Sequence, residues 1–280
     1  MGAEPYPRAS TRRDVDADAW VEPATEQTDA PAGTPVVVSI DDDNDVVIDL
    51  APSSRPVIVD LVTTVEPPED LSTGLLVAPW WRLAIKRSID IVGSLVLLLL
   101  LSPIFLVTAI AIAVTSEGEV IHRQERIGRN GRPFTMLKFR SMVVGAHEQR
   151  HLYEHRNDHE TGPIFKIRDD PRITRVGRVI RRFSIDELPQ LANVLIGDMS
   201  LVGPRPPLPE EFETYNVRQQ LRTLATPGLT CIWQVSGRSD VDFDSWVDMD
   251  LEYIKRWTIR LDLTLLLKSV PSVIAGHGAY

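Results

Sequence analysis

Two adjacent carboxylates, Asp186 and Glu187, follow a cluster of arginines past the middle of the chain. The residues around them indicate the start of a helix, where amide N–H groups and nearby guanidinium groups keep a carboxylate ionised. An ionised carboxylate can act as a nucleophile toward phosphorus, and its neighbour can hold Mg²⁺, which prefers oxygen ligands. The pair therefore suggests phosphoryl chemistry.

The same residues also allow a purely structural interpretation. Ser184 and Glu187 have the spacing of a capping box, and Gly197 is a natural C-terminal stop. Because Pro189 would fall late for a first-turn proline, Asp186 is a second candidate for the N-cap. Both interpretations place the carboxylates at the N-terminus of a helix.

A loop rich in glycine and proline, residues 197–206, follows this helix. It carries Asp198, a possible second metal ligand. It also carries Arg205 between two prolines, where a rigidly presented guanidinium could bind a phosphate.

The region before the carboxylates is strongly basic. Residues 121–182 contain 15 Lys and Arg against seven Asp and Glu, a net charge of +8. Within it, Asn130-Gly131 predicts a β-hairpin over residues 124–142, with Lys138 and Arg140 on one face of the second strand. Such a hairpin could bind anionic lipid headgroups or a phosphate-bearing substrate. Nucleic acid is a third possibility, but an adjacent membrane segment argues against it.

Two further patterns lie in this basic region. Four histidines recur at a spacing of four residues: His147, His151, His155 and His159. On a helix they would form one stripe, either a solvated face among charged residues or a transition-metal site. The spacing of Arg175, Arg178 and Arg182 predicts a helix with a cationic face.

Residues 89–114 are almost entirely apolar, with Asp90 as the only charge. About 20 apolar residues can cross a bilayer as a helix. Ser102 and Pro103 stand at the centre, where the proline breaks the helix into two arms too short to cross. Basic residues on both flanks would put both ends in the cytoplasm: Arg82, Lys86 and Arg87 before, and His122, Arg123, Arg126 and Arg129 after. These residues leave a span and a re-entrant helix-break-helix hairpin as alternatives.

Charge divides the 280-residue chain, whose formal net charge is −9. Residues 1–80 contain 16 acidic and four basic residues and ten of the 21 prolines, whereas residues 81–280 carry a net charge of +3. We therefore expect a largely disordered acidic tail over residues 1–80 and an ordered domain over residues 81–280. Apolar segments at 36–40, 46–50 and 57–62 could be short strands. The single cysteine, Cys231, excludes an intramolecular disulfide and a Cys-based zinc site.

Five motifs occur in order along residues 80–280. They are Lys86-Arg-x-x-Asp90 before the Ser-Pro-broken apolar segment, Lys138-Phe-Arg-Ser-Met142, Ser184-x-Asp-Glu-Leu-Pro-Gln190, Gly197-Asp-Met-Ser-x-Val-Gly-Pro-Arg-Pro206 and Pro227-Gly-Leu-Thr-x-x-Trp-Gln-Val-Ser-Gly-Arg238. With these motifs the chain resembles the bacterial sugar transferases, monotopic phosphoglycosyl transferases that start polysaccharide and glycoconjugate assembly.

The resemblance implies a reaction. In the family, a nucleotide-diphosphate sugar gives its sugar-1-phosphate to a membrane polyprenyl phosphate, with release of UMP. Asp186 matches the nucleophile that forms a covalent intermediate, and Glu187 matches the ligand of the Mg²⁺ cofactor. Arg205 would by analogy bind a phosphate. The other candidates for substrate or phosphate binding are Arg181, Lys138, Arg140 and Arg238.

The resemblance also implies an architecture and a location. We expect an α/β, mostly helical, monotopic membrane protein with a re-entrant hairpin over residues 88–115, a small β-hairpin and interfacial amphipathic helices. Its catalytic part would face the cytoplasm at the bacterial inner membrane. Expected partners are a UDP-sugar, polyprenyl phosphate, membrane lipids and downstream glycosyltransferases, but no nucleic acid. Residues 257–274 have the composition of an interfacial helix that Pro271 bends or ends.

Two features refine this resemblance. The Trp-Gln-Val-Ser-Gly-Arg segment and the Gly-Ala-Tyr ending resemble the hexose-transferring exopolysaccharide branch, which favours UDP-glucose or UDP-galactose. Many longer relatives carry transmembrane helices and a nucleotide-binding-like domain ahead of the catalytic part, whereas residues 1–80 here contain no spanning helix. The alternative function is a non-catalytic membrane-anchored scaffold whose basic surface binds anionic lipid or a partner.

Overall fold

The computed structural model describes residues 37–40, 46–49, 73–156, 167, 169–236 and 242–275. The chain divides into two units, Met1–Pro56 and Val57–Tyr280. In the first unit, β1 (Val37–Ile40) and β2 (Val46–Asp49) pair antiparallel, so two of the three apolar segments of the tail are strands. The third segment, residues 57–62, and the predicted disorder elsewhere in the tail lie outside the described residues.

The apolar segment of the second unit forms α2 (Trp80–Leu100) and α3 (Ser102–Thr115), which meet at a bend of 61°. The break stands where the sequence predicts it. Pro103 lies in the first turn of α3, where its missing N–H costs no helical hydrogen bond. Ser102 Oγ donates to the carbonyl of Leu99 at 2.8 Å, which uses a carbonyl at the end of α2.

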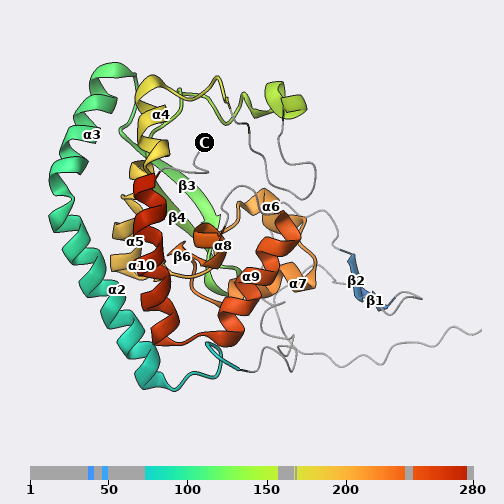
Figure 1. Cartoon of the computed structure of the whole chain (residues 1–280). Coiled ribbons are helices and arrows are strands. Elements are labelled where there is room, and N and C mark those ends of the chain that lie inside the picture. The colour runs from blue at the N-terminus through green and yellow to red at the C-terminus, as the bar shows by residue number, and fades with distance from the viewer. Residues whose placement is uncertain are drawn as a thin grey trace, which may run out of the picture. The chain divides into compact units, whose positions relative to one another are not determined.

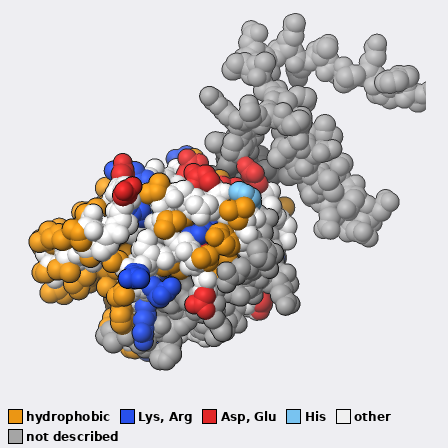
Figure 2. Space-filling view, turned by 90° about the horizontal axis from the view of Figure 1, so that it is seen from above, with side chains coloured by type: hydrophobic (Ala, Val, Ile, Leu, Met, Phe, Trp, Pro, Cys, Tyr) orange, Lys and Arg blue, Asp and Glu red, His pale blue; other side chains and the backbone are white. Residues whose placement is uncertain are grey.

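No single helix in the described part of the chain is long and apolar enough to cross a membrane, but the bent pair passes together by length and composition. Large apolar side chains are exposed along both arms, among them Leu99, Leu100, Leu106, Val107 and Val114. Figure 2 shows hydrophobic side chains gathered on a projecting edge, on the side where α2 and α3 lie in Figure 1. Soluble proteins rarely expose an apolar surface of this extent without a partner for it.

The predicted β-hairpin is confirmed. β3 (Ile121–Ile127) pairs antiparallel with β4 (Pro133–Phe139). Asn130 and Gly131 form the turn with positive φ values of 56° and 71°, a conformation that suits asparagine and glycine better than other residues.

The remaining elements surround this hairpin (Figure 1). They are α4 (Arg175–Arg182), α5 (Gln190–Ile196), β5 (Ser200–Val202), α6 (Pro209–Glu213), α7 (Val217–Gln220), β6 (Gly228–Thr230), α8 (Ile232–Ser236), α9 (Phe243–Arg256) and α10 (Ile259–Ala275). β5 and β6 form a short parallel pair. α5 packs against both α2 and β4, and so joins the apolar arms to the hairpin. The unit is mostly helical with a small β-hairpin, as predicted, and α4 is the predicted basic helix.

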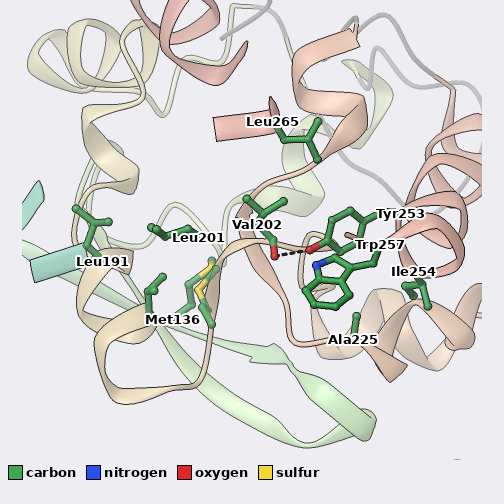
Figure 3. Close-up of a cluster of buried hydrophobic side chains, with 11 residues drawn as sticks. Met136, Leu191, Leu201, Val202, Ala225, Tyr253, Ile254, Trp257 and Leu265 are labelled. Atoms are coloured by element: carbon green, nitrogen blue, oxygen red, sulfur yellow. Dashed lines mark hydrogen bonds between the residues drawn. The ribbon is translucent and has the colours of Figure 1, made fainter. Parts of the chain in front are cut away.

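The main core gathers side chains from β4, α5, β5, α9 and α10 (Figure 3). Val194, Tyr253 and Ile254 have no exposed surface. Figure 3 shows the Tyr253 hydroxyl donating to the carbonyl of Val202, at 3.0 Å. Trp257 also belongs to this core and is 2% exposed. Trp257 is therefore not part of the exposed face of the segment 257–274, which the sequence predicts as an interfacial helix, because its ring packs inward between α9 and α10.

The C-terminal helix α10 runs through Pro271 to Ala275, so Pro271 does not end it. Leu263, Leu267 and Val270 on α10 are about half exposed or more. Their spacing of three and four residues places them on one face.

Lys86 attaches α2 to the rest of the second unit from within the core. It is 9% exposed, and its Nζ lies 2.8 Å from Asp262 Oδ2 of α10. The same amine donates to the carbonyl of Val202 at 3.0 Å. A buried amine needs such partners because its charge has lost the solvation of water.

Arg87 and Asp90 attach the next turn of α2. Arg87 donates to two carbonyls near the C-terminus of α5, at 2.6 and 2.8 Å, where a cation also complements the helix dipole. Asp90 Oδ1 accepts from Ser200 Oγ and from the backbone N–H of Leu201, at 3.0 and 2.9 Å. The motif Lys86-Arg-x-x-Asp90 therefore fixes α2 against α5, β5 and α10.

The far end of α3 is attached separately. Arg140, directly after β4, donates through Nη2 to the carbonyl and the hydroxyl of Ser116, both at 2.9 Å. Ile112 of α3 packs in a second cluster with Phe139 and Ile180. Both ends of the apolar pair therefore contact the same domain.

Candidate active site

A cavity of about 970 Å³ opens beside the β3–β4 hairpin. Its lining includes Lys138 of β4, the carboxylate pair Asp186 and Glu187, Arg205 from the loop after β5, and Trp233 of α8. Four segments that are far apart in sequence thus contribute polar and aromatic side chains to one cavity. Such a cavity is the usual form of a small-molecule site.

The carboxylates lie on a 3-10 turn, Ile185–Glu187, that precedes α5. Ser184 has a left-handed conformation with φ 54° and makes no side-chain cap. Its N–H, which a capping box would direct to Glu187, donates instead to the carbonyl of Arg181 at 3.0 Å. The predicted capping box is therefore wrong, and so is the N-cap role for Asp186, since α5 begins after Pro189. The predicted stop at Gly197 is confirmed, with φ 109°.

The Glu187 carboxylate is held between two cations. Its Oε1 lies 3.4 Å from Lys138 Nζ and 3.6 Å from Arg205 Nη1. Burial alone would raise the pKa of Glu187, but Lys138 and Arg205 together lower it below its ordinary value. Glu187 is therefore an anion at neutral pH.

Asp186 has the opposite tendency. It is 9% exposed, and burial, followed by the negative charge of Glu187, raises the pKa of Asp186 to about 6. Lys138 and Arg181 oppose this shift without cancelling it. Asp186 is therefore ionised at neutral pH but poorly solvated, which is the state that favours nucleophilic attack.

Lys138 completes the electrostatic environment. Burial lowers the pKa of Lys138 to about 8, although Glu187 favours its charged form. The nearby guanidinium groups of Arg205 and Arg126 add to the lowering. Lys138, Arg181 and Arg205 thus act on the two carboxylates, and this surplus of positive charge suits a substrate carrying phosphate.

The sequence of residues 81–276 matches the family model described as bacterial sugar transferase. The chain belongs to the bacterial sugar transferase family. Over 202 residues it is 47% identical to the galactosyl transferase CpsE of Streptococcus agalactiae serotype III (strain NEM316), covering 71% of this chain and 44% of that protein.

Two other relatives match a similar share of this chain. The exopolysaccharide production protein ExoY of Rhizobium meliloti (strain 1021) is 39% identical over 70% of this chain and 88% of ExoY. The undecaprenyl-phosphate galactose phosphotransferase of Salmonella typhimurium is 45% identical over 70% of this chain and 42% of that protein. The chain thus spans less than half the length of two of these relatives and most of the third.

The other candidates for substrate or phosphate binding divide between the cavity and its supports. Arg181 lines the cavity and its charge acts on both carboxylates. Arg140 also lines the cavity, but its Nη2 is directed to Ser116 at the end of α3 rather than to the carboxylates. Lys138 and Arg140 therefore do not act on one target, although they were predicted to share a strand face. Arg238 lies outside the described residues.

Asp198 is separated from Glu187, the other predicted metal ligand. It follows the C-terminus of α5, whereas Glu187 precedes its N-terminus, and a helix of seven residues is about 10 Å long. Asp198 Oδ2 instead lies 3.5 Å from the Asn193 amide. No group of three or more His, Cys, Asp or Glu residues suited to a metal occurs among the described residues. Mg²⁺ is often held by one or two carboxylates plus substrate phosphates, and the pair Asp186 and Glu187 fits that donor set.

The histidine stripe does not form as predicted. His147 lies in a turn that lines the cavity, and Arg150–Arg156 is a 3-10 helix, in which residues four apart do not align. His151 is exposed and its Nδ1 lies 2.7 Å from the carbonyl of Glu148. His159 lies outside the described residues.

Two buried arginines that line the cavity were not predicted as site residues. Arg126 of β3 is 7% exposed and Arg222, between α7 and β6, is 3% exposed, and both line the cavity. Arg126 was noted only as a flanking charge of the apolar segment. The sequence could have indicated the position of Arg126. Alternate residues of a strand lie on one face, so the predicted hairpin places Arg126 beside Gln124. Arg222 has no local signal, since its partners are distant in sequence.

Proposed function

We propose that this protein transfers sugar-1-phosphate from a UDP-sugar to polyprenyl phosphate and releases UMP. The names of its relatives support this reaction, since they include galactose and glucose phosphotransferases that act on undecaprenyl phosphate. The sugar we propose is glucose or galactose, which are the two hexoses in those names. The product would be a polyprenyl-diphosphate sugar, the start of an exopolysaccharide or glycoconjugate.

The observation that carries the proposal is a buried carboxylate, Asp186, beside a carboxylate that two cations hold. The Asp186 oxygen would attack the sugar-bearing phosphorus, forming an aspartyl–phosphorus bond and breaking the bond to the UMP oxygen. UMP leaves with that electron pair. A polyprenyl phosphate oxygen would then attack the same phosphorus and release the Asp186 carboxylate. Lys138, Arg181 and Arg205 would neutralise the phosphoryl charge in both steps.

The cofactor we propose is Mg²⁺, with Glu187 as its protein ligand and phosphate oxygens of the substrate completing the donor set. When bound, the ion would neutralise charge on the leaving phosphate. Glu187 suits this role because Lys138 and Arg205 keep it ionised. Asp198 is not required for it.

The membrane arrangement we propose is a re-entrant hairpin at the cytoplasmic face of the bacterial inner membrane. The exposed apolar side chains of α2 and α3 would enter one leaflet. Both ends of this pair are attached to the catalytic domain, by Lys86 and Arg87 at one end and Ser116 at the other. A segment whose two ends bind one folded body supports re-entry over a span. The exposed leucines of α10 would lie at the same interface.

The transfer reaction is tested by UMP release from UDP-galactose and UDP-glucose, with polyprenyl phosphate in detergent or nanodiscs. The wild type, Asp186→Asn and Asp169→Asn are compared. Asp169 is exposed and does not line the cavity, so it serves as the matched control. We expect Asp186→Asn to lose activity and the control to retain it. Full activity of Asp186→Asn would refute the aspartyl intermediate. Salt-sensitive lipid binding by a wild type that releases no UMP would favour the scaffold instead.

The membrane arrangement is tested by cysteine labelling on sealed vesicles. Cys231 has no exposed surface, so cysteines introduced at Val77 and Glu119 would give the signal. Both positions are exposed and flank the apolar pair. Labelling of both by an impermeant maleimide on the same side supports re-entry, whereas labelling on opposite sides would exclude it.

A further inference from the structure

The loop that presents Arg205 has an unusual shortage of hydrogen-bond donors. Pro204, Pro206 and Pro207 have no backbone N–H, so the loop can be fixed mainly through its carbonyls. Each of its four successive carbonyls accepts one hydrogen bond. The donors to residues 204, 205, 206 and 207 are, in order, Gly228 N at 2.9 Å, Arg222 Nη2 at 3.2 Å, Arg126 Nη1 at 3.1 Å and Ile127 N at 3.0 Å.

Two of these four donors are main-chain groups, and the other two are the buried side chains of Arg126 and Arg222. The side-chain donors serve the carbonyls of Arg205 itself and of Pro206, the residue after it. The direction of the Arg205 side chain depends on the backbone at these two positions. Its guanidinium lines the cavity and lies 3.6 Å from Glu187.

Arg222 is itself held firmly. Its Nε donates to Asp250 Oδ2 at 2.7 Å and its Nη1 to the Tyr215 hydroxyl at 3.2 Å. Cys231 Sγ donates to the other oxygen of Asp250 at 2.8 Å. Asp250 is fully buried, so this ion pair has little freedom to move.

Arg126 is held from the other side of the loop. Its Nε and Nη2 donate to Gln124 Oε1 at 3.3 and 2.9 Å, and its Nη1 lies 3.9 Å from Glu211 Oε2. The same Glu211 oxygen accepts from the backbone N–H of Leu208, directly after the loop, at 2.8 Å. Arg126 therefore connects β3, the loop and the start of α6.

We propose that Arg126 and Arg222 are positioning residues for the transfer reaction. They fix the backbone of residues 205 and 206 so that the Arg205 guanidinium remains aimed at Glu187 and the substrate phosphate. Neither needs to contact the substrate. This inference rests on the proposed function, because its effect is on a phosphate contact made by Arg205.

A double-mutant cycle separates positioning from general support of the fold. Arg126→Met is measured alone and in combination with Arg205→Ala. The double replacement of Arg222→Met and Asp250→Leu is measured in the same two backgrounds. Replacing both partners of a buried ion pair avoids leaving one charge unpaired. The matched control replaces Arg218 and Asp248, an exposed Arg–Asp pair, in the same way. Rates of UMP release, KM for the UDP-sugar and thermal unfolding midpoints are recorded for each.

In the presence of Arg205, we expect each replacement to lower kcat/KM by about tenfold to a hundredfold, the cost of a displacement on the order of 1 Å. In the Arg205→Ala background we expect a further loss of less than about twofold, and no effect of the control pair in either background. An equal loss in both backgrounds, or no loss in the first, would overturn the inference. If the paired replacement does not fold, the cycle with Arg126→Met decides.

The two proposals fail in different ways. A wild type that releases no UMP from any UDP-sugar overturns the proposed function, and this inference with it. The other case is a wild type that is active and that loses activity on Arg205→Ala. If the effects of replacing Arg126 and Arg222 then add to that of Arg205→Ala, this inference alone is overturned.

Discussion

Replacement of Asp186 by asparagine should abolish transfer and, at neutral pH, make the protein more stable. The Asp186 side chain is buried, and burial together with the charge of Glu187 raises its pKa from 3.8 to about 6. At neutral pH the carboxylate is therefore ionised in a place that disfavours its charge. Asparagine has nearly the same shape and no charge, so it avoids that cost while losing the nucleophile.

The sign and size follow from the direction of the shift. A raised pKa means that the folded protein binds the Asp186 proton more tightly than the unfolded chain does. The free energy of unfolding therefore falls as pH rises from about 4 to about 6. A shift of about two units, at about 1.4 kcal/mol each, gives a cost of about 3 kcal/mol that is complete above about pH 7. For a domain of about 200 residues this is roughly 6–12 °C in Tm.

The assay is thermal unfolding in detergent micelles, followed by tryptophan fluorescence, near pH 4, 6 and 7.5. Asp186→Asn should match the wild type at the lowest pH and exceed its Tm at the highest. Glu187→Gln is the matched comparison with the opposite sign. Lys138 and Arg205 lower the pKa of Glu187, so its charge contributes stability above pH 4.5 that is lost as pH falls further. A Tm difference for Asp186→Asn that is the same at every pH would refute the argument that burial destabilises the ionised carboxylate.

Three further outcomes are expected. Burial lowers the pKa of Lys138 to about 8, so the pH profile of kcat/KM should fall above about pH 8, and Lys138→Arg should move that fall to higher pH. The Mg²⁺ concentration that gives half-maximal UMP release should be unchanged by Asp198→Asn and raised by Glu187→Gln. Lys86→Met should lower the free energy of unfolding by about 3–5 kcal/mol because it leaves the buried Asp262 carboxylate without its counter-charge. Asp262→Asn in the same chain should recover part of this in thermal unfolding, because asparagine removes the charge but keeps an acceptor for Tyr253 and Trp257.

The sequence was most informative where one residue decides the local backbone. Asn130-Gly131 predicts the hairpin turn because few other residues adopt positive φ, and the structure has that turn. Pro103 predicts the break of the apolar helix because it lacks an N–H, and α3 begins there. Gly197 predicts the end of α5 for the same steric reason as the turn.

The sequence was least informative where a distant partner decides. The capping-box prediction assigned the Glu187 carboxylate to a backbone N–H three residues away. In the structure that carboxylate faces Lys138, 49 positions earlier in the chain, and Arg205. Trp257 likewise stands at the start of a segment with the composition of an interfacial helix, yet its Nε1 donates to Asp262 in the core at 3.1 Å. A local pattern does not show which distant charges lie nearby in the fold. A charge-assisted hydrogen bond to such a partner is stronger than one to a neutral cap, so the distant partner decides where the side chain points.

The charges beside the apolar segment have a different meaning in three dimensions. The positive-inside argument for re-entry counted Lys86 and Arg87 as free cations on the first flank. Both are directed into the protein, toward Asp262 and the carbonyls of α5. Of the three cations counted there, only Arg82 is exposed, so the charge argument for that flank is weaker than the sequence suggests. The same contacts supply a stronger argument, because they fix the start of α2 to the domain that also holds Ser116 at the end of α3. Two ends attached to one body favour re-entry whatever the surrounding charge.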